Sequence, residues 1–491
     1  IAMNLVFKPV ILTTDALIFL LIAVVAASAW YISRHQHLVA PWRKVAHNRG
    51  GMIACVILLA FVSVGLLDSV HFRPRLTGDA ASGKPNYAVD VMSLFDVIAA
   101  PLRTRQEKTY SAPLATHLFS KETVELPDGT EARVFPRLTY GGAHLKDPER
   151  EWSRDIINRV VAGVAIAALI WNVLLLCITL WLAHRTARGV RETWIAVWSG
   201  ETEVPWREML VTNGVLLLVF VPMVVLSAKY HVLGTDKVGQ DVFYLALKSI
   251  RTGLVIGTLT TLVMLPFALL LGILAGYLRG WVDDAIQYVY TTLQSIPGVL
   301  LIAASVLILQ GVIDRHEDWF QTASERADAR LFLLCMILGV TSWTGLCRLL
   351  RGESLKLREL DYIQAAHAFG VPDFRIITRH ILPNVMHIVL IAIVMDFSGL
   401  ILAEAVLSYV GVGVDPTMNS FGTMINAARL EMARDPMVWW SLASAFAFML
   451  LLVLSANLFA DAVRDAFDPR IRGRLAAPDF LSKYLPALRS R

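Results

Sequence analysis

Residues 354–384 of this 491-residue chain read SLKLRELDYIQAAHAFGVPDFRIITRHILPN and separate two long apolar stretches. The run favours a helix, with an apolar stripe made by Leu355, Leu357, Leu360, Ile363, Ala366 and Phe369. Gly370 is typical of a left-handed helix stop, and Pro372 suits the first turn of a second short helix over residues 373–380. The pattern predicts a helix-turn-helix across one end of the apolar stretches. Such an element either seats in a cleft of a soluble partner or rests on the membrane surface.

The composition places the chain in a lipid bilayer. Hydrophobic residues make up 56% of it and charged residues only 17%, and the mean hydropathy is +0.57. A soluble domain usually carries about 25% charged residues. The net charge of +5 comes from short basic clusters beside apolar runs, which indicates membrane topology and not a nucleic-acid surface. The four cysteines lack CxxC spacing and are expected to be packing residues.

Nine apolar stretches are long enough to cross a bilayer. They lie near residues 11–32, 51–69, 157–183, 211–228, 250–277, 286–311, 331–350, 385–411 and 438–461. Lys and Arg collect after the first, third and seventh stretches and in the C-terminal tail, and short basic loops stay in the cytoplasm. With nine spans, a cytoplasmic C-terminus puts the N-terminus outside. The first stretch lacks a clear cleavage site and is expected to be a retained span.

A signature in the opening segment resembles a known family. Residues 364–366 (Gln-Ala-Ala), Gly370 and residues 382–383 (Leu-Pro) resemble the EAA signature of binding-protein-dependent ABC permeases. The resemblance implies ATPase-coupling roles for Asp361, Gln364, Ala365, Ala366, Gly370, Arg375, Leu382 and Pro383. Gln364 stands where Glu is usual and His380 where Ile is usual. Since Gln keeps the hydrogen-bonding ability of Glu but loses its charge, coupling is expected through packing more than through a salt bridge.

Further stretches, in the family's order, narrow the resemblance to the peptide class, the permeases of oligopeptide, dipeptide and nickel importers. They are residues 231–241 (HVLGTDKVGQD), 251–257, 276–283, 401–413 and 457–470. The resemblance covers about residues 231–472, half of the chain. The family usually places one span before the Gly-Thr-Asp stretch, and here there are four. In this extension only residues 42–49 (WRKVAHNR) look like the family.

The resemblance implies an all-α polytopic membrane protein with a type I ABC importer transmembrane domain of about five to six helices, preceded by an extension. The expected domains are 1–69 (N-terminal transmembrane helices), 70–156 (extracytoplasmic segment), 157–230 (further transmembrane helices), 231–472 (permease core with a coupling loop at 351–383) and 473–491 (cytoplasmic tail). Turn signals at 127–129 and 141–142 predict some strand in the extracytoplasmic segment, around residues 132–138.

The implied function is half of a translocation pathway for peptides or a related small solute, in the bacterial inner membrane. The implied partners are a second permease, one or two ABC ATPase subunits, an extracytoplasmic binding protein and the lipid bilayer, with no nucleic acid. The sequence contains no GxxxxGK[ST] motif, so ATP and Mg are expected on the ATPase subunits. No catalytic role, metal or cofactor is expected for this chain itself.

Four acidic residues outside the coupling loop are candidates for the pathway or a gate: Asp236, Asp241, Asp396 and Glu404. Asp236 and Asp241 are either cation ligands or, more simply, caps of local amides in a glycine-rich turn. Asp396 and Glu404 fall in an apolar stretch, where an unpaired charge is costly, so each faces the pathway or a structural partner.

Two alternatives remain at the level of the sequence. A secondary transporter, or another polytopic membrane protein without ATPase partners, would share the span count but would not need the 354–383 loop. A membrane enzyme would need a convergent catalytic set, and the chain contains no HExxH or GxSxG motif.

Overall fold

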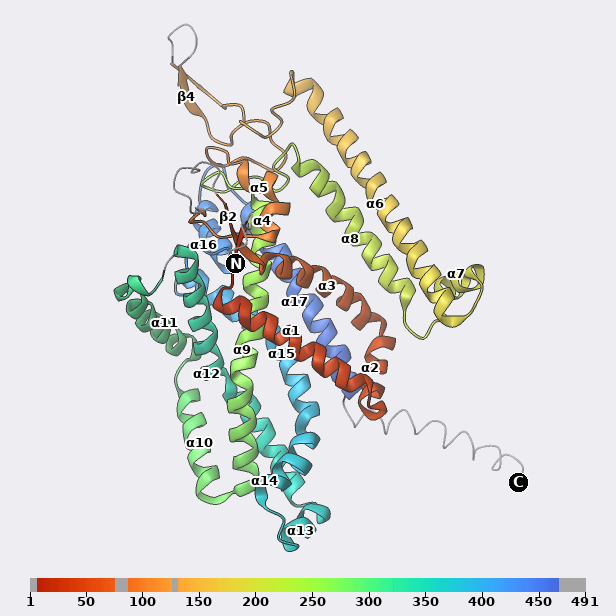
Figure 1. Ribbon diagram of the computed structural model, residues 1–491. Helices are drawn as coiled ribbons and strands as arrows, with labels where there is room; N and C mark the ends of the chain where they lie inside the picture. The colour runs from red at the N-terminus through yellow and green to blue at the C-terminus, as the bar shows by residue number, and fades with distance from the viewer. Residues whose placement is uncertain (1–6, 76–86, 126–130, 321, 468–491) are drawn as a thin grey trace, which may run out of the picture.

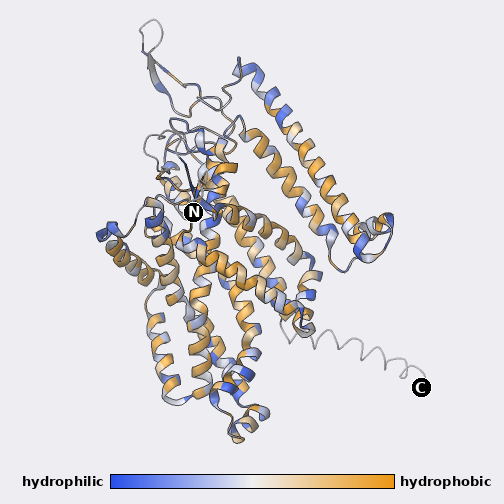
Figure 2. Ribbon diagram, in the orientation of Figure 1, coloured by the Kyte–Doolittle hydropathy of each residue, from blue (hydrophilic) through white to orange (hydrophobic). Residues whose placement is uncertain are grey.

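The computed structural model describes residues 7–75, 87–125, 131–320 and 322–467. In these residues nine helices are long and apolar enough to cross a membrane, which confirms the predicted polytopic helical fold. Their bounds are α1 Thr13–Ser33, α3 Arg49–Asp68, α6 Pro148–Thr186, α8 Trp206–Ser227, α9 Val242–Leu278, α11 Gly298–Arg315, α12 Ala323–Arg358, a continuous helical segment Asp373–Val410, and α17 Trp440–Phe467. Figure 2 shows that hydrophobic residues dominate these helices and that hydrophilic ones gather at the ends of the molecule.

Shorter elements connect these helices. The helices are α2 Gln36–His47, α4 Leu94–Ile98, α5 Ala100–Thr104, α7 Val190–Ser199, α10 Gly280–Ser295, the 3-10 helix η1 Glu317–Trp319, α13 Asp361–Ala368, α14 Asp373–Ile376, the π-helical turn η2 Ile377–Ile381, α15 Leu382–Val410 and α16 Phe421–Glu431. The strands are β1 Phe7–Val10, β2 His71–Pro74, β3 Met92–Ser93, β4 Glu122–Glu125 and β5 Glu131–Val134.

The strands form two small antiparallel sheets, β1-β2-β3 and β4-β5. β1 pairs with β2 so that Phe7 faces Pro74, which places the N-terminal strand on the side of the membrane helices that carries residues 87–145. Helices α13 and α14, in the predicted coupling loop, lie at the opposite end (Figure 1). The strand expected around residues 132–138 is shorter, ending at Val134, and the turn expected at 127–129 lies outside the described residues, as does the tail 473–491.

The centre of the fold is the pair α9 and α12, which pack along most of their length, with α15, α17 and α3 around them. Glycine allows this close approach: a Cβ on Gly276 of α9 would lie 2.6 Å from the carbonyl oxygen of Arg351 on α12. α6 and α8 form a hairpin that stands to one side and joins the core where α8 packs on α3 (Figure 1). Within the hairpin, a Cβ on Gly163 would lie 2.6 Å from the Cα of Pro222.

Buried charges fasten the N-terminal helix to this centre. The guanidinium of Arg251, on α9, lies 2.6 Å from Oδ1 of Asp15, on α1, and 3.8 Å from Oδ1 of Asp328, on α12. The backbone N–H of Thr14 donates to Oδ2 of Asp328 at 3.1 Å, and Nδ1 of His71 lies 2.7 Å from Oδ2 of Asp15. Since a buried charge needs a partner, this network holds three separate helices in one register.

The structure corrects the sixth predicted span. The apolar stretch 286–311 is two helices, α10 and α11, because Ile296 between them is extended, with φ −89° and ψ 132°. Pro297 disfavours the helical conformation at the residue before it, so the chain breaks there. The membrane-crossing helix is therefore Gly298–Arg315, and residues 286–295 belong to a separate helix beside α9 and α12.

Candidate functional site

The coupling loop differs in its elements from the predicted pair of helices. The first predicted helix, from residue 354 to 369, is divided because α12 continues to Arg358 and Leu360 is extended, so α13 starts only at Asp361. The second predicted helix does not stop before Pro383: α14 passes through the wide turn η2 into α15. A π-type turn shifts the backbone pairing, which accommodates the missing N–H of Pro383 without a break.

The turn between α13 and α14 requires glycine for its backbone conformation. Gly370 has φ +76°, a value that L side chains rarely adopt. No heavy atom lies within 4 Å of the position that its Cβ would take, so packing places no demand on this residue. A substitution at Gly370 therefore changes the direction of the turn rather than creating a clash.

One side of the coupling loop is buried and the other is exposed. Ile363 is 1% exposed in a cluster formed with residues of α9, α10, α12 and α15, and Ala366 and Leu382 pack against the same cluster. The other predicted coupling residues, Asp361, Gln364, Ala365, Gly370, Arg375 and Pro383, are exposed. The Gln364 amide donates to the Glu359 carbonyl oxygen at 3.2 Å.

Two aromatic side chains on the exposed side were not predicted as coupling residues. Phe369 is 87% exposed and Phe374 is 79% exposed, on either side of Gly370. The sequence pattern put Phe369 in the buried stripe, together with Leu360, which is 42% exposed. The missed signal is that both phenylalanines flank a helix stop, where the helical stripe no longer determines which way a side chain points.

Polar contacts tie the coupling loop to the long helices. The Tyr277 hydroxyl at the end of α9 donates to Oδ1 of Asp373 at 2.7 Å, and Arg358 donates to the Tyr277 carbonyl oxygen at 2.6 Å. Beside them, Arg351 of α12 binds both carboxylate oxygens of Asp283 on α10, at 2.6 and 2.7 Å. This hydrogen-bonded pair lowers the pKa of Asp283 below its ordinary value. The loop is thus braced against α9, α10 and α12.

A cavity of about 940 Å³ opens between α12 and α15, with contributions from α9 and α17. Asp396 lines it and has neither a hydrogen bond nor an ion pair in the described part of the chain. Glu404, two turns further along α15, is different. It is buried and its Oε1 accepts hydrogen bonds from the hydroxyls of Ser408, at 2.6 Å, and Ser420, at 2.8 Å. The two intramembrane acids therefore have unlike surroundings, and only Asp396 lines the cavity.

Asp236 and Asp241 lie at the other end of the molecule, in the turn before α9. Oδ1 of Asp236 accepts from the N–H groups of Val238 and Gln240, at 3.0 and 2.8 Å. Oδ1 of Asp241 caps α9 by accepting from Phe243, at 2.9 Å, and Tyr244. These contacts are those of amide caps. No group of three or more acidic, His or Cys residues in the described ranges is arranged to hold a metal ion.

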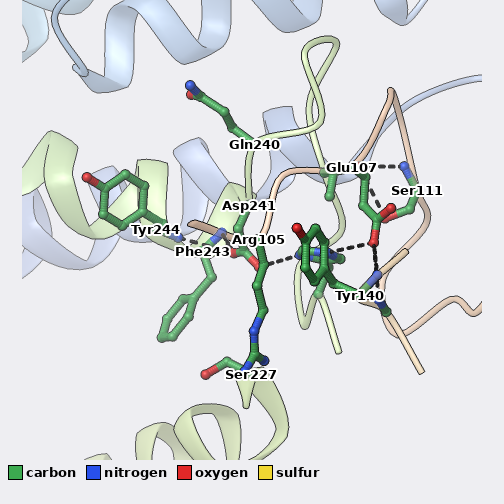
Figure 3. Close-up of polar contacts among 12 residues, drawn as sticks. Arg105, Glu107, Ser111, Tyr140, Ser227, Gln240, Asp241, Phe243 and Tyr244 are labelled. Carbon is green, nitrogen blue, oxygen red and sulfur yellow. Dashed lines mark hydrogen bonds and ion pairs between the residues drawn. The ribbon is translucent and has the colours of Figure 1, made fainter. Parts of the chain in front are cut away.

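The same turn is joined by a buried histidine to the segment that contains Glu107, within residues 87–125. Nδ1 of His231 lies 2.8 Å from Oδ2 of Asp241, and its Nε2 lies 3.5 Å from Oε1 of Glu107. Glu107 also accepts backbone hydrogen bonds from residues 139–141, at 2.8 to 3.1 Å. Figure 3 shows Glu107 and Asp241 arriving from different segments, with Tyr140 beside Glu107. We call these contacts the Glu107–His231–Asp241 cluster.

Charge pairing outweighs desolvation in this cluster. Burial disfavours the ionised form of Glu107, but the contact with His231 and the three N–H groups lower its pKa to about 2. Burial likewise disfavours charged His231, but Asp241 and Glu107 raise its pKa to about 9. The cluster therefore holds a cation between two carboxylates at neutral pH.

The described residues form a polytopic helical membrane protein with a cavity between α12 and α15 and a braced loop at one end. Residues 268–473 match the family model described as "Binding-protein-dependent transport system inner membrane component". The glutathione transport system permease protein GsiD of Pectobacterium atrosepticum is 34% identical over 244 residues, 49% of this chain and 73% of that one. The chain belongs to this family of ABC importer permeases.

Other relatives fall in the peptide class of the family. The oligopeptide transport system permease protein OppC of Mycobacterium tuberculosis is 31% identical over 242 residues, 49% of this chain and 77% of that one. The dipeptide transport system permease protein DppC of Bacillus subtilis is 28% identical over 242 residues, 49% of this chain and 69% of that one. Among solved structures, an inward-facing MetNI methionine ABC transporter chain is similar with a TM-score of 0.36 and 14% identity, covering 46% of this chain and 98% of that one.

Proposed function

We propose that this permease forms half of the pathway of an ATP-driven importer for peptides or a related small solute, and that residues 351–383 couple it to an ATPase subunit. The solute class follows from the names of the relatives, which are peptide and glutathione transport permeases. The proposed partners are a second permease, one or two ATPase subunits that bind ATP and Mg, and an extracytoplasmic binding protein. This chain itself binds no cofactor.

One observation carries the coupling proposal: the coupling loop is exposed on one side and braced on the other. Phe369 and Phe374 offer large apolar surface to a partner, and aromatic anchors supply much of the binding energy at protein interfaces. On the braced side, Ile363 and Tyr277 connect the loop to α9 and α12, the helices at the centre of the fold. A force on the exposed side therefore reaches the helices that border the cavity.

The proposed topology places the coupling loop and the C-terminus in the cytoplasm of a bacterium, and β1 with residues 70–156 outside the inner membrane. The pairing of β1 with β2 supports a common side for the N-terminus and that segment. The proposed core remains 231–472, with residues 1–69 and 157–230 as additional membrane helices and 473–491 as a cytoplasmic tail. Labelling of a cysteine introduced near residue 117 only from the cytoplasmic side would contradict this orientation.

The test replaces the turn residue of the coupling loop. In the complex with its ATPase, Gly370→Val is expected to abolish solute transport while the chain still reaches the membrane, because Val does not tolerate φ +76°. Gly370→Asn is the matched control, since Asn adopts the left-handed conformation and should retain most of the transport. Uptake by the Val variant equal to that of the unmodified chain would refute the coupling assignment.

A further inference from the structure

The cavity between α12 and α15 has an uneven distribution of charge. Its apolar lining comes from one face of each helix, including Leu346 and Leu349 of α12 and Ile388 and Ala392 of α15. Three of its ionisable residues lie towards the coupling-loop end: Glu353, His387 and Arg464. The fourth, Asp396, is nine residues beyond His387 on α15, about 13 Å deeper at 1.5 Å per residue. Among the described residues that line the deep part of the cavity, Asp396 is therefore the one ionisable group.

Asp396 makes no hydrogen bond or ion pair with any of the residues that the structure describes. It lies near the middle of the 29-residue helix α15. A charged side chain at this depth costs at least a few kcal/mol, and intramembrane acids that persist usually serve a ligand, a pathway or a partner. Glu404 on the same helix is a contrasting case: this acid has a structural role, since it is buried and accepts hydrogen bonds from two hydroxyl groups.

Space for a ligand lies next to Asp396. Gly399, on the next turn of α15, and Gly345, on the facing helix α12, both line the cavity. No heavy atom lies within 4 Å of the position that a Cβ would take at either glycine. The cavity therefore reaches the bare backbone of both helices, on α15 within one turn of the carboxylate, and its volume of about 940 Å³ can accept the chain of a solute rather than a single ion.

We propose that Asp396 receives the protonated amine of the transported solute, such as the α-ammonium group of a peptide, while the rest of the solute lies along Gly345 and Gly399. This inference rests on the proposed importer function. A carboxylate in a cavity with apolar walls accepts charge-assisted hydrogen bonds from an ammonium group and excludes a carboxylate or a neutral acyl group from the same place. Such a site selects for amine-bearing solutes within the permease, in addition to any selection by the binding protein.

The test uses a cysteine reporter in the assembled complex, without the binding protein. In Gly399→Cys, the labelling rate by a small cationic thiol reagent is measured with and without millimolar trialanine, and with N-acetyl-trialanine, which lacks the amine. Trialanine is expected to protect the cysteine, and N-acetyl-trialanine to protect it roughly 10- to 100-fold less effectively, because the bond to a charged group is lost. Labelling without the introduced cysteine gives the background from the native thiols.

Two second-site variants complete the experiment. Asp396→Asn in the reporter background should remove the preference for trialanine over its acetylated form. Glu208→Gln should leave the preference unchanged, because that carboxylate lies on α8, outside the lining of the cavity, and pairs with Arg49 at 3.4 Å. Equal protection by the two peptides, no protection by either, or a preference that survives Asp396→Asn would overturn the proposal.

A rival explanation, that Asp396 pairs with a cation of the second permease, makes a different prediction. The reporter would then be unreactive in the complex but reactive in the isolated chain, and Asp396→Asn would reduce recovery of the second permease. That result also overturns the proposal. Failure of the importer function itself is read separately, from the Gly370 variants, which do not touch the cavity.

Discussion

Replacing Glu107 by Gln is expected to release the segment that contains this residue from the turn before α9. Glu107 and His231 are both nearly fully buried, at 6% and 3% exposure. The pKa of His231 rises from 6.5 to about 9, and one pKa unit corresponds to 1.36 kcal/mol, so the charged cluster contributes about 3 kcal/mol to the docked state. Removing the Glu107 charge should cost about 2–3 kcal/mol, since Gln no longer pairs with the imidazolium and its single amide oxygen replaces only one of the two carboxylate oxygens that accept from residues 139–141.

The assay is hydrogen exchange at the amides of residues 139–141, which donate to Glu107. In Glu107→Gln their protection should fall roughly 30- to 160-fold, from 1.36 kcal/mol per factor of ten. Glu122→Gln is the matched control in the same segment. Glu122 pairs with Lys108 at 2.7 Å, but the lysine is 73% exposed, and such surface pairs contribute little. Equal protection in the two variants would refute the role assigned to the Glu107–His231–Asp241 cluster.

The pH dependence of the unmodified protein gives a second check. Because the folded pKa of His231 is raised, its contribution is complete below pH 6.5 and is lost as the pH rises through 9. Because the pKa of Glu107 is lowered from 4.5 to about 2, its contribution is complete above pH 4.5 and is lost as the pH falls through 2. Protection at residues 139–141, corrected for intrinsic exchange rates, should therefore be greatest between pH 4.5 and 6.5. Protection that increases from pH 7 to 9 would contradict the assignment.

Three further substitutions test other contacts. Arg251→Met removes the guanidinium that lies beside the buried carboxylates of Asp15 and Asp328. It should lower the free energy of unfolding by about 3–5 kcal/mol, measured as thermal stability in detergent, and unchanged stability would contradict the network. Replacing Phe369 and Phe374 together by Ala should weaken ATPase binding at least about tenfold while changing stability by under about 0.5 kcal/mol, and normal co-purification would argue against these anchors. Gly163→Leu should overpack the contact with Pro222 and destabilise the α6–α8 hairpin by about 1–3 kcal/mol, which unfolding monitored at a reporter on α6 would detect.

The number of membrane helices could be predicted from the sequence because the bilayer requires long apolar runs, which are a local property. The sixth span was predicted wrongly because Pro297, an equally local signal, was given too little weight. Hydropathy continues through residues 286–311, but Pro297 breaks the helix. Pro383 does not break the helix, because the π-helical turn η2 before it shifts the backbone hydrogen bonds so that none depends on the N–H that proline lacks. Proline alone does not distinguish these two outcomes.

The polar contacts were much less predictable. The capping of α9 by Asp241 is local, and one of the two readings of the sequence described it. The ion pair between Asp15 and Arg251 joins residues 236 positions apart, and nothing in the periodicity of either helix indicates the other. The exposed position of Phe369 depends on the course of the chain after Gly370, which a helical pattern does not describe. Tertiary contacts decide these cases.

The long separation between Asp15 and Arg251 also sets an order of events during biosynthesis. A ribosome adds about 5–20 residues per second, so Arg251 follows Asp15 by roughly 10 to 50 s. Throughout that interval α1 carries the Asp15 carboxylate, while Arg251 has not yet been synthesised. Helix α1 thus reaches its final place only after α9 has been synthesised and inserted.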